Sequence, residues 1–315
     1  MPDRDGGRAP AERAVLRAAL GDYPHTAALR EGRISSDLLA LDFVDIAPIN
    51  RAFAPMLREH RFDVSEIAIA SFLQAKAYGK RFVLLPVVLA ARFQEPALLC
   101  LAGSAIRGPA DLAGRRVGVR AYGQTTGVWL RGILADAYGV GPEAVRWVTF
   151  EDAHVAEYRD PPWIERAPLG ADLMGMLRQG AIDAVIVGND LPADPTLRTV
   201  FPDPTAAGQA FWRGHGIVPI NHMVTVGSDL AECRPDLVVD LVRMFREAAA
   251  ADPDTAKRLP YAVDAASLAP ALALALRYAG QQGLLPRTLS VAELWAGLPA
   301  PLLAPYQRVS AEAKA

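Results

Sequence analysis

Cysteine is scarce in this 315-residue chain, which contains only Cys100 and Cys233. The two cysteines match no spacing of metal ligands, and no HxH or HExxH pattern of histidines occurs. Cys100 lies in an apolar run, residues 97–102, and is interpreted as a small core residue rather than a nucleophile. The local sequence therefore demands no metal, and a reducing, cytoplasmic location is expected.

A surplus of charge is also missing, because 33 basic residues face 35 acidic ones and the net charge is −2. Without a basic stripe, binding to nucleic acid has no electrostatic basis. The longest apolar run, residues 82–91, contains Pro86 and is shorter than the roughly 20 residues of a membrane span. Residues 1–13 lack the apolar core of a secretion signal. We therefore expect neither a membrane segment nor an exported protein.

What is present is an ordinary globular composition, with 51% apolar and 22% charged residues, in a chain long enough for two cores. Apolar runs alternate with helical patterns, which is typical of parallel strands joined by crossover helices. Strands are expected at residues 15–20, 39–46, 62–69, 82–90, 116–120, 145–150, 184–187 and 221–226. Helices are expected at residues 50–59, 71–78, 126–138 and 173–179, and in much of the chain after residue 235.

The order of these elements predicts an α/β chain that builds one lobe, crosses to a second and returns. Lobe 1 is expected to contain residues 1–102 and 222–315, and lobe 2 residues 103–221. In open α/β sheets, ligands bind beyond the carboxyl ends of the strands. The loops that follow the strands of both lobes therefore predict a ligand cleft between the lobes.

The first polar loop follows the first expected strand and contains Tyr23, His25 and Thr26. Thr26 is a good capping residue and Pro24 stiffens a turn, so a turn and a helix cap account for this segment. The functional alternative makes His25 a proton-transfer or ligand-binding group and makes Tyr23 and Thr26 contacts to the ligand.

Glu66 interrupts an otherwise apolar stretch, residues 64–73. A carboxylate in such a stretch is costly to bury unless it is paired or functional. It could form an ion pair across the lobes or point to solvent, but its apolar surroundings favour a functional role.

The segment that starts at Arg120 leads from a strand into a helix. Of the candidate loops, it has the clearest pattern of an anion-binding site. Free N–H groups at the helix start, the hydroxyls of Thr125 and Thr126 and the helix dipole favour a bound carboxylate. Arg120 could add a bidentate contact. Tyr122 and Trp129 could stack on an aromatic ring or fill the core.

Two further loops place a histidine beside carboxylate or amide groups near a strand end. These are His154 and the pair Asn221 and His222. His25, His154 and His222, with Glu66 or Asp152, could gather as metal ligands, so a divalent metal stays an alternative although no cofactor is required.

Seven segments between residues 22 and about 226 carry a family resemblance: residues 22–26, 41–43, 62–68, 115–122, 125–134, 154–158 and 216–222. They resemble 4,5-dihydroxyphthalate decarboxylases, most specifically at residues 125–134 and in the string Pro219-Ile220-Asn221-His222. That family is similar to periplasmic binding proteins of the second structural type. The resemblance implies a two-lobed fold and the loss of carbon dioxide from a hydroxylated benzene dicarboxylate.

Such a reaction needs a base near a ring hydroxyl, an acid near the ring carbon, and cationic or N–H partners for the carboxylates. We assign carboxylate binding to Arg120, Thr125 and Thr126, hydroxyl deprotonation to Glu66 alone or with His25, and proton donation to His222 or His154. The partner is then a small aromatic carboxylate, and a homo-oligomer is compatible with the sequence.

Two other classes of protein fit the same fold. A solute-binding protein of an uptake system should carry an export signal or a lipid-attached cysteine near its start, and we expect neither. A sensor, or another enzyme such as one that makes a vitamin precursor, should place phosphate-binding groups or a reactive lysine or cysteine in the cleft. Lys76 and Lys80 instead lie on a polar helix end.

Overall fold

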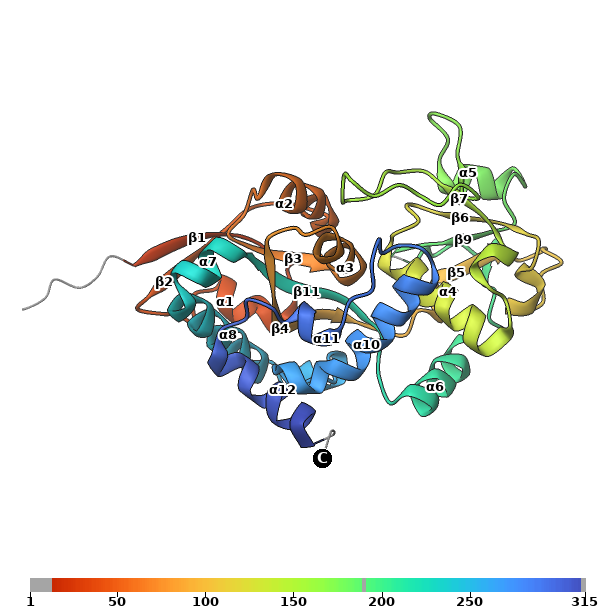
Figure 1. Cartoon of the computed structure of the whole chain (residues 1–315). Coiled ribbons are helices and arrows are strands. Elements are labelled where there is room, and N and C mark those ends of the chain that lie inside the picture. Colours follow the sequence, from red (N-terminus) through yellow and green to blue (C-terminus); the bar gives the residue numbers. More distant parts are fainter. Residues whose placement is uncertain (1–12, 189–190, 313–315) are drawn as a thin grey trace, which may run out of the picture.

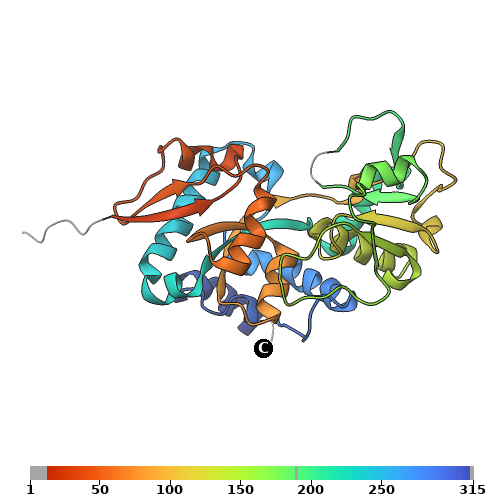
Figure 2. The ribbon, with the colours of Figure 1, turned by 90° about the horizontal axis from the view of Figure 1, so that it is seen from above.

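The computed structural model describes residues 13–188 and 191–312, which form two lobes with one β-sheet each (Figure 1). Residues 1–12, which make up most of the segment searched for a secretion signal, lie outside the described residues. Seen from above, the two lobes lie side by side, with the yellow and green middle of the chain in one of them (Figure 2). The expected two-lobed α/β fold is confirmed.

The first sheet has the strand order β2-β1-β3-β11-β4. Its strands are β1 (Ala14–Ala19), β2 (Leu39–Phe43), β3 (Val64–Ala68), β4 (Phe82–Ala91) and β11 (Ile220–Gly227). The first three pair in parallel, whereas β11 is antiparallel to both of its neighbours. Strand β4 tolerates Pro86 because it lies at the edge of the sheet, and its register with β11 shifts next to this proline.

The second sheet has the order β10-β5-β9-β6-β7-β8. Its strands are β5 (Leu98–Leu101), β6 (Arg116–Val119), β7 (Arg146–Thr149), β8 (Glu165–Arg166), β9 (Ala184–Ile186) and β10 (Leu197–Thr199). Strands β9, β6, β7 and β8 are parallel neighbours, and β5 is antiparallel to β9 and β10. The carboxyl ends of the parallel strands in this sheet face the first lobe.

The chain passes from the first sheet to the second between Ala91 and Leu98, and it returns between Thr199 and Ile220. The sequence places the first boundary later, after residue 102. Strand β5 pairs within the second sheet because Leu99 completes the core of that lobe.

Helices cover both sheets. They are α1 (Ala27–Arg30), α2 (Phe53–Glu59), α3 (Ile69–Ala77), α4 (Thr125–Tyr138), α5 (Leu173–Arg178), α6 (Pro204–His215), α7 (Ser228–Cys233), α8 (Pro235–Ala251), α9 (Thr255–Arg258), α10 (Ala265–Gln281), α11 (Val291–Leu294) and α12 (Ala300–Glu312). None of the helices in the described part of the chain is long and apolar enough to cross a membrane.

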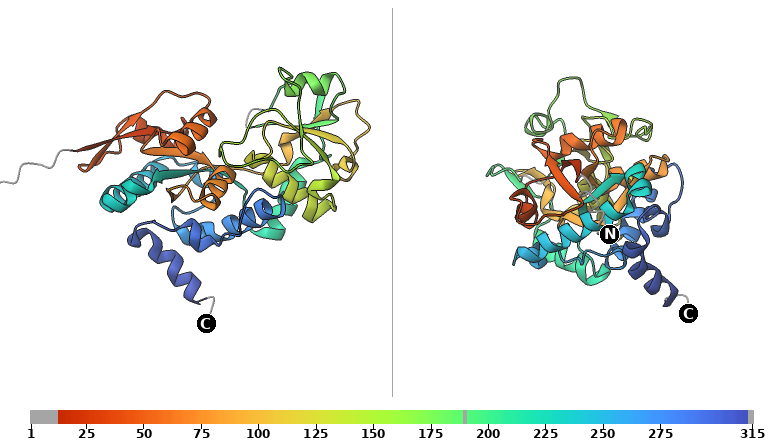
Figure 3. Two further views of the ribbon diagram at one scale, coloured as in Figure 1. Left: turned by 45° about the horizontal axis from the view of Figure 1, so that its top comes forward. Right: turned by 90° about the vertical axis from the view of Figure 1, so that its left-hand side faces the viewer.

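One C-terminal helix joins the two lobes. Helix α10 packs against α4 of the second lobe, and the blue C-terminal helices run along one side of the molecule (Figure 3). The Tyr278 ring lies directly over Gly132, and the buried Arg131 donates to Gln282 Oε1 over 2.6 Å. Gln282 Nε2 in turn donates to the Val128 carbonyl over 2.8 Å. The lobes are therefore connected by a packed helix pair as well as by the chain crossings.

Candidate active site

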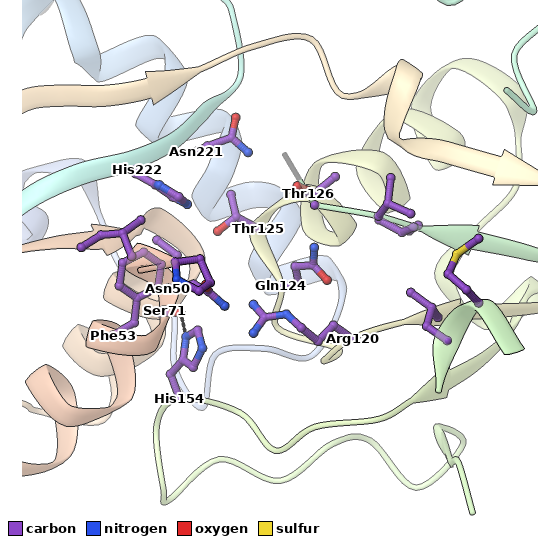
Figure 4. Close-up of a pocket in the computed structure, with 18 residues that line it drawn as sticks. Asn50, Phe53, Ser71, Arg120, Gln124, Thr125, Thr126, His154, Asn221 and His222 are labelled. Atoms are coloured by element: carbon purple, nitrogen blue, oxygen red, sulfur yellow. Dashed lines mark hydrogen bonds between the residues drawn. The ribbon is translucent and has the colours of Figure 1, made fainter. Parts of the chain in front are cut away.

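A cavity of about 360 Å³ opens between the lobes, where the loops that follow the strands were expected to meet. The first lobe lines it with Pro48, Ile49, Asn50, Phe53, Ala68, Ser71, Asn221 and His222. The second lobe lines it with Arg120, Gln124, Thr125, Thr126, His154, Leu173, Met174, Ile186, Val187 and Gly188. His222, His154 and Arg120 surround one space, with the two threonines beside it (Figure 4).

His222 reaches the cavity from strand β11 and is backed by a buried carboxylate. Its Nδ1 lies 2.6 Å from Glu66 Oε1, and Glu66 on the neighbouring strand β3 has no exposed surface. Because Nδ1 is engaged by Glu66, Nε2 is the ring nitrogen left for the cavity. This is the arrangement of a histidine whose tautomer and orientation are set by a carboxylate.

The environment of Glu66 keeps it ionised. Burial by itself would raise its pKa, but hydrogen bonds from His222, from the Tyr23 hydroxyl and from the Gly21 N–H hold the pKa below its ordinary value. Tyr23 Oη donates to Glu66 Oε1 over 2.7 Å, and Gly21 N donates to Oε2 over 2.8 Å. The ionised carboxylate thus accepts the hydrogen bond of the His222 ring and fixes its orientation.

The start of helix α4 forms one edge of the cavity. The side chain of Gln124, at the N-cap position, makes no hydrogen bond to the first turn, so this end of the helix has no side-chain cap. Thr125 Oγ1 accepts a hydrogen bond from Ala70 N over 3.2 Å, which ties α4 to α3. Arg120 comes from the end of β6 and pairs with the half-exposed Glu151 over 2.9 Å. Cation, helix dipole and uncapped N–H groups all favour a carboxylate here.

His154 enters the cavity from the loop after β7, where its Nδ1 lies 2.8 Å from Ser71 Oγ of the other lobe. Burial, followed by the positive charges of Arg120 and Arg58, lowers the pKa of His154 to about 4. This ring is therefore neutral near pH 7 and can accept a hydrogen bond from a ligand. Phe53 packs edge-on against His154 and His222, with ring centroids at 5.7 and 5.2 Å.

Asn221 is held at the cavity wall by a residue that the sequence analysis did not select. Gln94 and Asn221 exchange two amide hydrogen bonds, of 2.9 and 3.3 Å, and both side chains are buried. Gln94 lies just after β4, where the chain crosses to the second lobe, so no local motif marks it as part of a site.

Six of the predicted site residues line the cavity: Arg120, Thr125, Thr126, His154, Asn221 and His222. Six others do not: Tyr23, His25, Thr26, Glu66, Tyr122 and Trp129. The segment before α1 instead packs behind the site, where His25 stacks on Tyr23 with ring centroids 5.1 Å apart. Burial lowers the pKa of His25. Thr26 is buried and donates to the Gly21 and Tyr23 carbonyls.

The structure places Tyr122 and Trp129 in the core of the second lobe. Tyr122 is fully buried, and the Arg131 guanidinium lies over its ring at 4.0 Å. Trp129 donates from its indole nitrogen to the Ile220 carbonyl and packs edge-on against Tyr278. For both aromatic residues, the structure therefore agrees with the alternative that they fill the core and do not stack on a ligand.

Several cavity residues were missed because they belong to ordinary structural patterns. Phe53 lies inside the expected helix at residues 50–59, and Ser71 is the first residue of the expected helix at residues 71–78. The apolar wall formed by Leu173 and Met174 comes from a short helix with no polar motif. Among the described residues, no three His, Cys, Asp or Glu side chains gather as a metal-binding group.

The fold belongs to the class of two-lobed, periplasmic-binding-protein-like structures. The alkanesulfonate-binding protein SsuA from Xanthomonas axonopodis pv. citri, bound to MOPS, superposes with a TM-score of 0.55 at 15% identity, covering 90% of this chain and 98% of that protein. The desulfurization enzyme DSZB superposes with a TM-score of 0.54 at 18% identity, covering 94% and 100%. A binding protein and an enzyme thus share the fold, which alone does not decide the function.

The sequence is similar to two decarboxylases. It is 29% identical over 254 residues to the 4,5-dihydroxyphthalate decarboxylase of Comamonas testosteroni, covering 75% of this chain and 74% of that enzyme. It is 28% identical over 211 residues to the enzyme of the same name from Pseudomonas putida, covering 63% and 81%. These relatives confirm the predicted resemblance, and both belong to the expected enzyme class of carboxy-lyases. No family model matches the chain.

Proposed function

We propose that this protein decarboxylates a hydroxylated aromatic dicarboxylate, converting 4,5-dihydroxyphthalate or a close analogue to protocatechuate, or its analogue, and carbon dioxide. The observation that carries the proposal is a cavity histidine, His222, backed by the buried Glu66 carboxylate and facing the same space as Arg120 and the start of α4. The two decarboxylase relatives support the same reaction.

The reaction replaces a carboxylate on the ring by a proton. A ring hydroxyl para to the leaving carboxylate pushes electron density to the carbon that bears it. His222 transfers a proton from Nε2 to that carbon, the bond to the carboxylate breaks, and its electron pair returns to the ring as carbon dioxide leaves. Each turnover consumes one proton, which the His222 ring regains from solvent.

Arg120 and the first turn of α4, with Thr125 and Thr126, bind the carboxylate that stays on the ring. Their N–H, hydroxyl and guanidinium groups line one edge of the cavity. The leaving carboxylate is favoured to depart from a less polar environment, and Leu173 and Met174 provide an apolar wall.

Glu66 is placed behind His222 rather than at a substrate hydroxyl, because it is fully buried and does not line the cavity. His25 is likewise outside the cavity. We assign the contact with the ring hydroxyl to the neutral His154, which accepts a hydrogen bond and so increases the electron density of the ring.

The same proposal includes a cytoplasmic location, where the two free cysteines Cys100 and Cys233 would stay reduced. Fractionation of cells that produce the protein, with cytoplasmic and periplasmic markers, tests the location.

The alternative function is a non-catalytic binding protein for an aromatic carboxylate.

The direct test is an anaerobic carbon dioxide release assay with 4,5-dihydroxyphthalate and purified protein. Parallel samples are treated with a chelator or supplemented with divalent metals, so that the same experiment shows whether a metal is needed. Release of carbon dioxide with formation of protocatechuate supports the enzyme. Saturable binding by calorimetry without release, in all samples, would assign the protein to the binding class.

The variant His222→Gln separates binding from chemistry. Removing the proton donor should lower kcat by about 10²- to 10⁴-fold, while the Kd for the substrate changes little. The matched control is His215→Gln, which changes an exposed histidine at the end of α6 and should leave both constants unchanged. Full turnover of His222→Gln would rule out this residue as the acid.

A further inference from the structure

The Glu66 carboxylate is surrounded by hydrogen-bond donors, two of which do not line the cavity. It accepts hydrogen bonds from Tyr23 Oη at 2.7 Å, Gly21 N at 2.8 Å and His222 Nδ1 at 2.6 Å. We propose that Tyr23 is a positioning residue, whose hydroxyl holds the Glu66 carboxylate in place against His222 and thereby keeps the His222 ring ready to donate its proton. The kinetic part of this inference rests on the proposed function.

The packing at Gly21 shows that the place of the Tyr23 ring is closely defined. A Cβ atom at position 21 would lie 2.5 to 2.7 Å from the Cε2, Cζ and Oη atoms of Tyr23. Only glycine lets the phenol lie over the backbone while the N–H of the same residue donates to Glu66. On its other face Tyr23 stacks on His25 with an angle of 7° between the ring planes, so the ring is enclosed from two sides.

The titratable side chains that act on Glu66 come from two elements. His222 lies on the adjacent strand β11, and Tyr23 and His25 belong to the segment before α1. Burial, with the nearby charge of Glu66, raises the pKa of Tyr23 far above its ordinary value, so the phenol stays protonated. Tyr23 therefore donates a hydrogen bond throughout the reaction and transfers no proton.

The ionisation state of Glu66 determines which nitrogen of His222 carries the reacting proton. While Glu66 is ionised, it accepts from His222 Nδ1–H and the reacting proton is on Nε2. Protonation of Glu66 would remove this acceptor for the His222 Nδ1–H. A hydrogen bond from Tyr23 favours the ionised carboxylate, so its loss should shift protonation of Glu66 to higher pH.

The test variant is Tyr23→Phe, which keeps the ring and removes the hydroxyl. We expect kcat to fall about tenfold, KM to change less than about twofold, and the acid limb of the kcat profile to move to higher pH. The matched control is Tyr261→Phe, which also removes the hydroxyl of a half-buried tyrosine. That hydroxyl bonds to the backbone of Val218, next to β11, and does not contact Glu66.

A second readout does not depend on turnover. In protein with ¹³C-labelled glutamate, the carboxyl resonance of Glu66, assigned by its loss in Glu66→Gln, reports the pH at which this group titrates. Its midpoint should be higher in Tyr23→Phe than in the wild type and unchanged in Tyr261→Phe. Gly21→Ala should give the same direction of change, because the added methyl group displaces the Tyr23 ring.

The outcomes separate the inference from the function on which it rests. If the Glu66 midpoint rises in Tyr23→Phe and the wild type releases no carbon dioxide, the positioning role stands and the decarboxylase proposal fails. If the wild type is active but Tyr23→Phe changes neither the midpoint nor the acid limb, Tyr23 is only a structural residue. A fall in kcat of equal size in Tyr261→Phe would also overturn the inference.

Discussion

Single residues at this site differ in charge state because their surroundings differ. Glu66 and His154 are both removed from bulk water, yet Glu66 is surrounded by hydrogen-bond donors and His154 by the positive charges of Arg120 and Arg58. Hydrogen-bond donors therefore hold Glu66 ionised against the effect of burial, whereas burial and the nearby cations together keep His154 neutral. In the proposed reaction, His222 with the anionic Glu66 behind it would be the proton donor, and the neutral His154 would be the hydrogen-bond acceptor in the same cavity.

The lowered pKa of His154 makes stability depend on pH. Its pKa is about 4 in the folded chain and about 6.5 in the unfolded chain. Between these values only the unfolded chain binds the proton, so the free energy of unfolding decreases as the pH falls. From pH 7 to pH 5 the loss due to His154 should be about 2 kcal/mol.

Urea unfolding at both pH values measures this difference. We expect His154→Gln to lose about 2 kcal/mol less than the wild type between pH 7 and pH 5, and His215→Gln to behave like the wild type. An identical loss in the wild type and in His154→Gln would contradict a neutral His154 in the folded chain.

Among the helices, α4 connects the cavity to the core of the protein. Its first turn lines the cavity with Thr125 and Thr126, and its middle packs against α10. The helix ends at Gly139, whose φ of 66° is the left-handed conformation typical of a helix C-terminus. Because the cavity end and the packed middle belong to one helix, packing against α10 determines where the N–H groups of its first turn lie.

The close contact between α4 and α10 can be tested at Gly132. A Cβ atom there would lie 2.2 Å from the Tyr278 ring. Gly132→Ala should therefore destabilise the protein by about 1–3 kcal/mol, although alanine favours a helix.

The control is Gly280→Ala within α10, where the added methyl group would meet nothing within 4 Å. Thermal and urea unfolding should show unchanged or slightly higher stability for this variant. Equal effects of the two substitutions would show that helix propensity, rather than packing at Tyr278, decides the outcome.

At the scale of the whole molecule, one loop of the second lobe reaches across the cavity to the first. This cross-lobe loop, residues 150–164, connects β7 to β8. Arg58 donates to the carbonyls of Ala153 and His154 over 2.6 and 2.9 Å, and Lys80 pairs with Glu157 over 2.6 Å. Lys80, which was expected on a polar helix end, is thus paired with Glu157 of the cross-lobe loop. These contacts tie the loop, which carries the cavity residue His154, to the first lobe.

Loss of the Arg58 contacts should weaken retention of the substrate. In Arg58→Ala we expect faster dissociation and an increase in Kd of about fivefold, since about 1 kcal/mol of closing free energy is lost. Stopped-flow binding and calorimetry measure both quantities.

The control is Arg61→Ala, because Arg61 pairs with Glu59 close by in the sequence and does not reach the cross-lobe loop. An unchanged dissociation rate in Arg58→Ala would mean that the loop does not limit release of the substrate.

The fold class could be predicted from the sequence because apolar periodicity is local information. The expected strands and helices agree with β1, β3, β4 and α4 to within about two residues, since buried strands and amphipathic helices have characteristic spacings. Arg120, Thr125 and Thr126 could be grouped for the same reason, because they are close in the sequence and follow one strand. They line one cavity, and their role in carboxylate binding stays a prediction. The sequence also identified Glu66 and His222 as chemically notable residues.

Which of these residues come into contact depends on the pairing of strands that are distant in the sequence. Glu66 and His222 are far apart in the sequence and meet because β11 returns to pair with β3. That pairing places Glu66, which was expected to act as a base, behind the His222 ring. Tyr23, which was expected to contact the ligand, donates to Glu66 instead. Strand β5 joined the second sheet for a similar reason. Long-range strand pairing depends on which surfaces bury one another, and this cannot be read from any local pattern.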